Sequence, residues 1–214
     1  MTTATKNGTT DLSITIPMLD LRILRVKLVG DSSLISHRWS DKAKREMLDK
    51  QMKKAKQAKE AKNPEEDYNQ SMYRFHEGRD QRDEKIWDGV SYGFPSTGFK
   101  NAAVTAVTHV AGMTKVAARG MFHVNLGQDL VKINGTPEPR EDMVRIQMTT
   151  DIRYRGEFRE WSVDLDVQYN AAAVSPEQVV NLFNVAGFAV GVGEWRPEKN
   201  GSFGMFHVAT TDDG

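Results

Sequence analysis

Residues 161–188 read WSVDLDVQYNAAAVSPEQVVNLFNVAGF and change their hydrophobic period in the middle. Apolar and polar residues alternate up to Tyr169, which is the pattern of a strand buried on one face. The run from Ser175 to Gln178 is a capping box with proline at the first helical position, and apolar residues then recur at helical spacing. We predict a strand followed by a helix that ends at Gly187. The residues expected to face inward on the strand are Trp161, Val163, Leu165, Val167 and Tyr169.

A glycine-rich segment, residues 187–206, follows this helix and precedes a last strand at residues 204–208. One interpretation is a loop whose backbone N–H groups approach a phosphate, with Arg196 and Lys199 as cations and Trp195 stacking on a base. The other is a β-hairpin that turns at Asn200-Gly201, a common hairpin dipeptide. The two interpretations are compatible, because a hairpin tip can also bind a ligand.

The chain before this region begins with a strand and then becomes strongly polar. Leu24, Val26 and Leu28 alternate with Arg25 and Lys27, which predicts a half-buried strand with a basic exposed face. Residues 40–62 predict a lysine-rich helix that starts at Ser40 or Asp41 and ends before Pro64. That helix is either a solvated surface element or a basic arm for a nucleic-acid backbone.

A second helix and several short strands are expected in the middle of the chain. Ser96 or Thr97 is predicted to cap a helix that buries Phe99, Ala103 and Val107. Residues 121–124 and 130–133 predict short strands, residues 134–142 a polar loop, and residues 143–149 another strand. Arg153, Arg155 and Arg159 form either a basic stripe on one strand or cross-strand pairs with Asp164, Asp166 or Glu157.

The order of these elements describes two β-α-β halves. Residues 21–133 give strand, insertion, helix and strands, and residues 157–208 give strand, helix, glycine-rich segment and strand. This order predicts an α+β, ferredoxin-like core, which the RNA recognition motif shares. We expect one domain over residues 12–208 with an insertion at about residues 40–91. The polar ends, residues 1–11 and 209–214, are expected to be disordered tails.

Two segments carry a resemblance to a known family. Residues 93–102, GFPSTGFKNA, and the glycine-rich segment 187–206 resemble the proline turn before the first helix and the glycine-rich loop of the RAMP superfamily, the repeat-associated proteins of CRISPR systems. Ser-Thr-Gly stands here where that family has Gly-Ser-Ser. The resemblance implies a backbone subunit that polymerises along a guide RNA, with other effector subunits as further partners. A viral or mobile-element relative with another nucleic-acid role is the alternative.

Composition limits the chemistry. The chain has no cysteine, which excludes disulfides, zinc-thiolate sites and thiol nucleophiles, and its formal net charge is zero, so any nucleic-acid contact depends on local patches. No apolar run is long enough to span a bilayer, and the first residues have no apolar core, so we expect a cytoplasmic protein without membrane contact. No HExxH, GxSxG or GxxxxGK[ST] motif is present, so we expect no cofactor, metal or catalysis. Asp164 and Asp166 could share Mg²⁺, but such strand-face acids are usually solvated.

Together these features predict a protein that binds single-stranded nucleic acid, RNA by the resemblance, without sequence preference, and that forms oligomers along the strand. The alternatives are a viral assembly protein and a metal-independent endoribonuclease that uses His37, since RAMP processing nucleases use a histidine. The expected partner is single-stranded RNA or DNA, together with copies of the same chain. The residues expected to bind are Arg25, Lys27, His37, Arg38, Trp39, Lys100, Trp195, Arg196 and Lys199.

Overall fold

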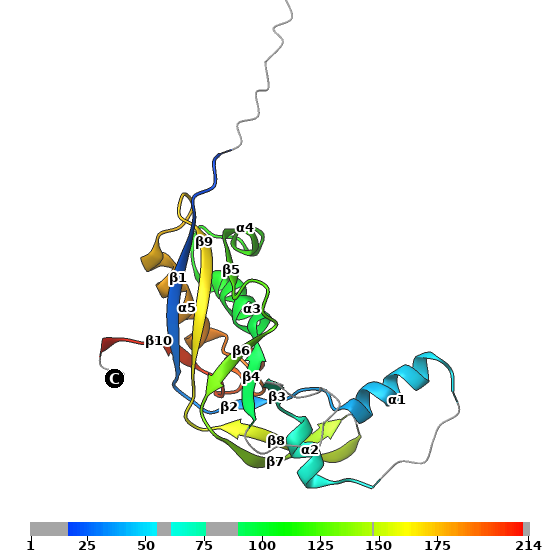
Figure 1. The fold of residues 1–214 in the computed structure, drawn as a ribbon. Helices are drawn as coiled ribbons and strands as arrows, with labels where there is room; N and C mark the ends of the chain where they lie inside the picture. Colours follow the sequence, from blue (N-terminus) through cyan, green and yellow to red (C-terminus); the bar gives the residue numbers. More distant parts are fainter. Residues whose placement is uncertain (1–16, 55–60, 76–89, 147, 212–214) are drawn as a thin grey trace, which may run out of the picture.

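The computed structural model describes residues 17–54, 61–75, 90–146 and 148–211, and within them the fold is α+β with antiparallel sheets (Figure 1). The first part of the chain contains β1 (Leu21–Gly30), β2 (Leu34–Ser36), α1 (Asp41–Gln51), α2 (Pro64–Gln70), β3 (Tyr73–Phe75), β4 (Ser91–Pro95), α3 (Ser96–Ala106), η1 (Val107–His109) and α4 (Lys115–Met121). The second part contains β5 (Phe122–Val124), β6 (Leu130–Asn134), β7 (Pro137–Ile146), β8 (Thr149–Phe158), β9 (Ser162–Asn170), α5 (Pro176–Ala189), η2 (Pro197–Lys199) and β10 (Phe206–Val208).

The larger sheet has the strand order β10-β1-β9-β6-β4-β3, and β5 also pairs with β9. Helices α3 and α5 contact each other and cover one face of this sheet (Figure 1). The hydrophobic core lies between these two helices and the sheet, and it includes the buried Phe99 of α3 and Phe183 of α5. The other face carries the charged side chains of β1 and β9.

The predicted alternation of β9 is confirmed. Val163, Leu165 and Val167 are buried, and so are Trp161 before the strand and Tyr169 near its end. The alternation of β1 holds as well, because Val26 and Leu28 are buried while Arg25 and Lys27 are exposed. The short strands β5 and β6 also lie where they were predicted.

Helix α5 begins as predicted but does not end at Gly187. The side chain of Ser175 accepts a hydrogen bond from the Gln178 N–H, and the Gln178 side chain accepts one from the Ser175 N–H. The helix continues through Gly187 to Ala189. A Cβ at Gly187 would lie 1.6 Å from the carbonyl oxygen of Phe206, so this glycine lets β10 cross close to the helix.

The lysine-rich region differs from the prediction in its second half. Ser40 caps α1 as expected, but this helix ends at Gln51 and buries none of its residues. Pro64 starts a helix instead of ending one, because it occupies the first turn of α2 behind the N-cap Asn63. A proline is tolerated there because the first helical N–H groups have no intrahelical partner.

A smaller sheet with the order β2-β8-β7 packs at one end of the molecule. Strands β7 and β8 form a long hairpin, which Figure 1 shows at the bottom of the molecule. The prediction of a loop over residues 134–142 was therefore wrong, because β7 begins at Pro137. An edge strand tolerates Pro137 and Pro139, since the missing N–H groups can fall on its unpaired side.

The predicted domain boundaries stay a prediction. The N-terminal tail, residues 1–11, lies outside the described residues, as do residues 212–214 of the C-terminal tail. The described part of the insertion at residues 40–91 contains α1, α2 and β3, and β3 joins the larger sheet through β4. Each helix in the described residues is too short or too polar to span a lipid bilayer.

Candidate nucleic-acid interface

His37 lies directly after β2, where two open clefts meet. We name the first the loop cleft; its volume is about 300 Å³, and it lies between β4, the start of α3 and the glycine-rich segment. The second, the basic cleft, has a volume of about 440 Å³ and lies between the start of α1 and strand β8. His37 lines both, so the two clefts form one continuous surface around this side chain.

The basic cleft combines cations with an exposed aromatic ring. Four Lys or Arg side chains line it, together with three acids, and Trp39 is 54% exposed at its edge. The cations are Arg38, Lys42, Lys62 and Arg153. The acids are Glu46, Asp67 and Asp151. Cations that can contact phosphates beside a ring that can stack on a base are the two components of single-strand binding sites.

Hydrogen bonds to α2 hold Ser36 and Arg38 in place. The buried hydroxyl of Ser36 donates to the carbonyl oxygen of Ser71, and the same oxygen accepts the Arg38 N–H at 2.7 Å. Ser71 is the C-cap residue of α2, so β2 and α2 together position Arg38, the residue before Trp39. This segment is therefore built into the fold.

Ion pairs orient the cations of the basic cleft. Arg38 lies 3.1 Å from Asp41, which Lys44 also contacts. Burial raises the pKa of Asp41, but the two cations together lower it by more, so the net shift is downward. Lys62 bonds to Asp151, and this hydrogen bond is the main reason that the pKa of Asp151 is lowered. Arg153 lies 3.9 Å from the same carboxylate, so Asp151 is paired with both Lys62 and Arg153.

The loop cleft contains a linked set of charged groups. His37 Nδ1 lies 2.9 Å from Glu194 Oε1, and this hydrogen bond is the main cause of the lowered pKa of Glu194. Arg155 is buried beneath, with Nη1 2.9 Å from Asp142 and Nη2 3.8 Å from Glu194. The network fastens the glycine-rich segment to β2 and to the β7–β8 hairpin.

The glycine-rich segment is folded onto the protein. The N–H groups of Val192 and Phe203 bond to the carbonyls of Gly204 and Trp195, so the segment folds back on itself, but its two arms are not β-strands. Asn200 adopts a left-handed conformation after the short helix η2, and the N–H of Gly201 bonds to the Arg196 carbonyl oxygen. The N–H groups of Glu194 and Gly204 bond to the carbonyls of Ile35 and Ser33. Gly204 has φ +63°, and a Cβ there would lie 1.7 Å from the Val192 oxygen. These glycines therefore serve close backbone packing.

The residues predicted to bind from this segment have different positions. Arg196 lines the loop cleft but is tied to Glu198 at 2.7 Å and to the carbonyl oxygen of Gly193 at 2.9 Å. Trp195 is exposed beside the cleft, and Lys199 is exposed on η2. Of this group, only Arg196 shares a cleft with His37.

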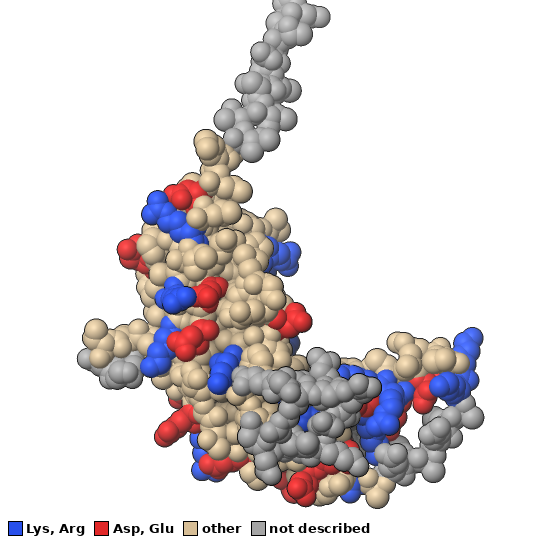
Figure 2. Space-filling model, in the orientation of Figure 1, with Lys and Arg blue, Asp and Glu red and all other residues tan. Residues whose placement is uncertain are grey.

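Three other predicted residues lie away from both clefts. Arg25 and Lys27 are on the open face of the sheet, where Arg25 pairs with Asp166 at 3.2 Å and Lys27 is in register with Asp164. Figure 2 shows blue and red side chains interspersed over β1 and β9, so this face has no basic stripe. Lys100 points to His123, with Nζ 3.0 Å from Nδ1, and burial lowers the Lys100 pKa.

No basic stripe is formed by Arg153 and Arg155 of β8 and Arg159 directly after it, and their partners differ from those predicted. Arg155 is buried against Asp142, and Arg159 pairs with Glu138 at 3.1 Å. Only Arg153 reaches a cleft.

The predicted cap of α3 was also wrong, because Pro95 holds the N-cap position and the Ser96 hydroxyl donates to the Gln128 carbonyl oxygen.

Sequence reasoning missed Lys42, Lys62 and Glu194 as members of this surface. The two lysines belong to a lysine-rich run in which nothing distinguishes them from their neighbours. Glu194 becomes significant only through His37, 157 positions away. Within the described ranges, no group of three or more His, Asp or Glu side chains is placed to hold a metal ion.

Comparisons with known proteins give little likeness. No protein-family model and no curated protein matches the chain. Among solved structures, the chain is similar to that described as "Crystal structure of Cmr6 from Pyrococcus furiosus", at 10% sequence identity and a TM-score of 0.40. The match covers 90% of this chain and 100% of that one. Since the likeness is so distant, function has to be argued from the residues of this chain.

Proposed function

We propose that this protein binds single-stranded nucleic acid without sequence preference, with the basic cleft as the main contact surface. Trp39 stacks on a base, and Arg38, Lys62 and Arg153 contact phosphates. The observation that supports this most directly is the position of the exposed Trp39 in a cleft that these cations line. The strand then passes His37 into the loop cleft.

We infer further that the core is ferredoxin-like. The strand order β10-β1-β9-β5, with α3 between β1 and β5 and α5 between β9 and β10, supports this arrangement. The open sheet face is not the proposed binding surface. Cations lie beside acids on both surfaces, but among the described residues no exposed aromatic side chain lies on β1 or β9, whereas Trp39 lines the basic cleft.

The resemblance to the RAMP superfamily extends the proposal to RNA, to the cytoplasm, and to copies of this chain and other effector subunits as partners. The two segments that carry the resemblance contribute to one surface: Gly98 and Asn101 from the first, and Gly191 and Arg196 from the second, line the loop cleft.

The decisive experiment compares two pairs of charge removals by fluorescence anisotropy with labelled oligouridine and oligothymidine. Arg38→Ala with Arg153→Ala removes two charges from the basic cleft, and Arg25→Ala with Lys27→Ala removes two from the sheet face. We expect the cleft variant to weaken binding tenfold or more, a loss of about 1.4 kcal/mol, and the sheet-face variant to change it little. Equal effects of the two pairs would contradict the assignment of the cleft.

Trp39→Ala tests stacking separately from charge. Loss of one base–aromatic contact is expected to reduce the binding free energy by roughly 1–3 kcal/mol. Trp195→Ala is the matched control, since this tryptophan is also exposed but lines neither cleft. Stacking at Trp39 is refuted if the two tryptophan variants bind equally well.

We propose that binding occurs without catalysis. The second candidate, a metal-independent endoribonuclease, is favoured by the His37–Glu194 pair, because a carboxylate that orients one ring nitrogen leaves the other available for proton transfer. Incubation of the pure protein with labelled RNA in EDTA separates the two, and we expect the RNA to stay intact. Cleavage that disappears in His37→Ala would establish the nuclease instead.

A further inference from the structure

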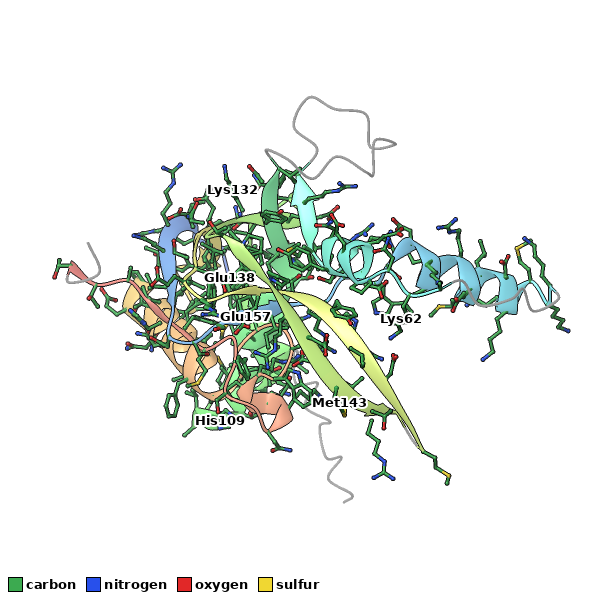
Figure 3. All side chains as sticks on the ribbon, turned by 90° about the horizontal axis from the view of Figure 1, so that it is seen from below. Lys62, His109, Lys132, Glu138, Met143 and Glu157 are labelled. Atoms are coloured by element: carbon green, nitrogen blue, oxygen red, sulfur yellow. The ribbon has the colours of Figure 1, made fainter. Side chains whose placement is uncertain are left out.

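Strand β7 has an unpaired side. It is ten residues long and forms the edge of the sheet β2-β8-β7, and among the described residues only β8 pairs with it. The β7–β8 hairpin projects from the body of the molecule, and Met143 lies on the projecting part (Figure 3). Met143 is 77% exposed. A projecting edge of this length can accept a further strand.

The register identifies the backbone groups that face this edge. Gly156 is opposite Pro139, and its N–H bonds to the Ser71 hydroxyl at 2.9 Å, away from β7. Pro139 therefore belongs to a pair that makes no hydrogen bonds with β8, and it has no N–H. Because backbone direction alternates along a strand, Glu141, Met143 and Arg145 direct their N–H and C=O groups toward the open edge.

We propose that β7 pairs antiparallel with β7 of a second copy of this chain, with the twofold axis at Met143. Met143 then lies opposite Met143 of the second copy, and Glu141 lies opposite Arg145 of the second copy on both sides of the axis. All three side chains are exposed and share one face of the strand. Opposite charges and apolar residues directly across an antiparallel pair stabilise it.

Both neighbouring registers are less favourable. Moving the axis one residue toward the C-terminus places Met143 opposite Arg145 of the second copy, so the charge pairs are lost. Moving the axis one residue toward the N-terminus places Pro139, which lacks an N–H, opposite Arg145 of the second copy. It also places Glu141 opposite Met143, so both charge pairs are lost. Pro139 thus ends the pairing at the base of the hairpin, and the charge pattern selects the axis at Met143. The result is one continuous sheet with the order β2-β8-β7-β7-β8-β2.

Charge reversal tests the register, using sedimentation of nuclease-treated protein over a range of concentrations. Glu141→Arg and Arg145→Glu each place like charges together twice, so each variant alone should dimerise roughly tenfold or more weakly than the unmodified chain. An equimolar mixture of the two should recover dimerisation, and so should the double variant. Lys132→Glu, a reversal on β6, is the control and should dimerise normally.

A single cysteine provides an independent test, because the chain has none of its own. Hydrogen-bonded residues across an antiparallel pair lie about 5.5 Å apart at Cα, which is within the range that a disulfide bridges. Met143→Cys should therefore form covalent dimers on mild oxidation much faster than Met148→Cys, which lies at the hairpin turn. A chain that is monomeric up to its solubility limit, equal cross-linking of the two variants, or failure of the mixture to recover dimers would each overturn the proposal.

Discussion

Arg155 is the charged side chain that the described fold buries most completely, at 2% relative exposure. Its Nη atoms contact Asp142 and Glu194, while no hydrogen-bond partner is found for its Nε atom within the described residues. A buried guanidinium is tolerated because carboxylates on two different segments compensate for its desolvation. Arg155 thereby connects the hairpin to the glycine-rich segment.

Removal of this charge should strongly destabilise the protein. Arg155→Ala removes one of the two arginines that contact Asp142, the other being Arg140, and it also creates a cavity. We expect a loss of about 3 kcal/mol in the free energy of unfolding, measured with urea. Arg159→Ala removes a neighbouring, exposed arginine and should cost about 1 kcal/mol or less. Similar urea midpoints for the two variants would show that the buried network contributes little.

Glu194 should make the fold sensitive to acid. Its pKa is lowered in the folded state, so its contribution to stability is present above the unfolded value of about 4.3 and is lost as the pH falls through the folded value. Glu194→Gln is therefore expected to be less stable than the unmodified chain at neutral pH, with a difference that shrinks below about pH 4.

Denaturant midpoints measured across this pH range check the expectation. Glu160→Gln, which removes an exposed carboxylate, is the control and should show little difference at either end. If the gap between Glu194→Gln and the unmodified chain is the same at neutral and acidic pH, the carboxylate is not stabilised by His37.

At the scale of the element, two helical glycines make a matched pair. A Cβ at Gly187 of α5 would meet the Phe206 carbonyl oxygen, whereas a Cβ at Gly120 of α4 would meet nothing within 4 Å. Gly120→Ala is expected to stabilise the protein by roughly 0.5–1 kcal/mol, because alanine loses less backbone entropy in a helix.

Gly187→Ala is expected to destabilise the protein by roughly 1–3 kcal/mol, since the new methyl group forces α5 away from β10. Thermal unfolding of both variants gives the comparison directly. A rise in melting temperature for both would mean that β10 packs less closely on α5 than the structure describes.

At the scale of the whole molecule, the zero net charge limits how strongly salt should affect binding. The four cations of the basic cleft can neutralise a few phosphates at most. For single strands, the plot of the logarithm of the binding constant against the logarithm of the salt concentration has a slope of about −0.7 per neutralised phosphate. Four phosphate contacts therefore give a slope no steeper than about −3. Anisotropy titrations at several salt concentrations measure it, and a much steeper slope would require a further basic surface.

The purified protein should also carry nucleic acid. Prepared without nuclease, it is expected to show an ultraviolet spectrum with excess nucleic-acid absorbance and a mass that falls after RNase treatment. Large particles free of nucleic acid would instead favour the assembly protein that the sequence left open as an alternative. Loss of nucleic acid in Trp39→Ala would connect the absorbance to the basic cleft.

The elements that could be predicted from the sequence are those whose signals lie within a few residues of one another. The alternation of β9, the Ser175 capping box and the buried stripe Phe99, Ala103 and Val107 are all read within a few residues, because periodicity and capping are short-range properties. The Ser40 cap of α1 belongs to the same class. These elements were sufficient to predict an α+β fold.

Features that depend on a residue far away in the sequence could not be predicted and appear only in the folded structure. Gly187 looked like a helix stop, but the approach of β10 places it inside α5, and the prolines of residues 137–139 looked like a loop because nothing local identifies an edge strand. The candidate site has the same character. Arg25 forms an ion pair with Asp166 on the neighbouring strand, and His37 forms a hydrogen bond with Glu194, which is 157 positions away in the sequence. Which charges are paired, and which remain available to a ligand, is set by packing between segments.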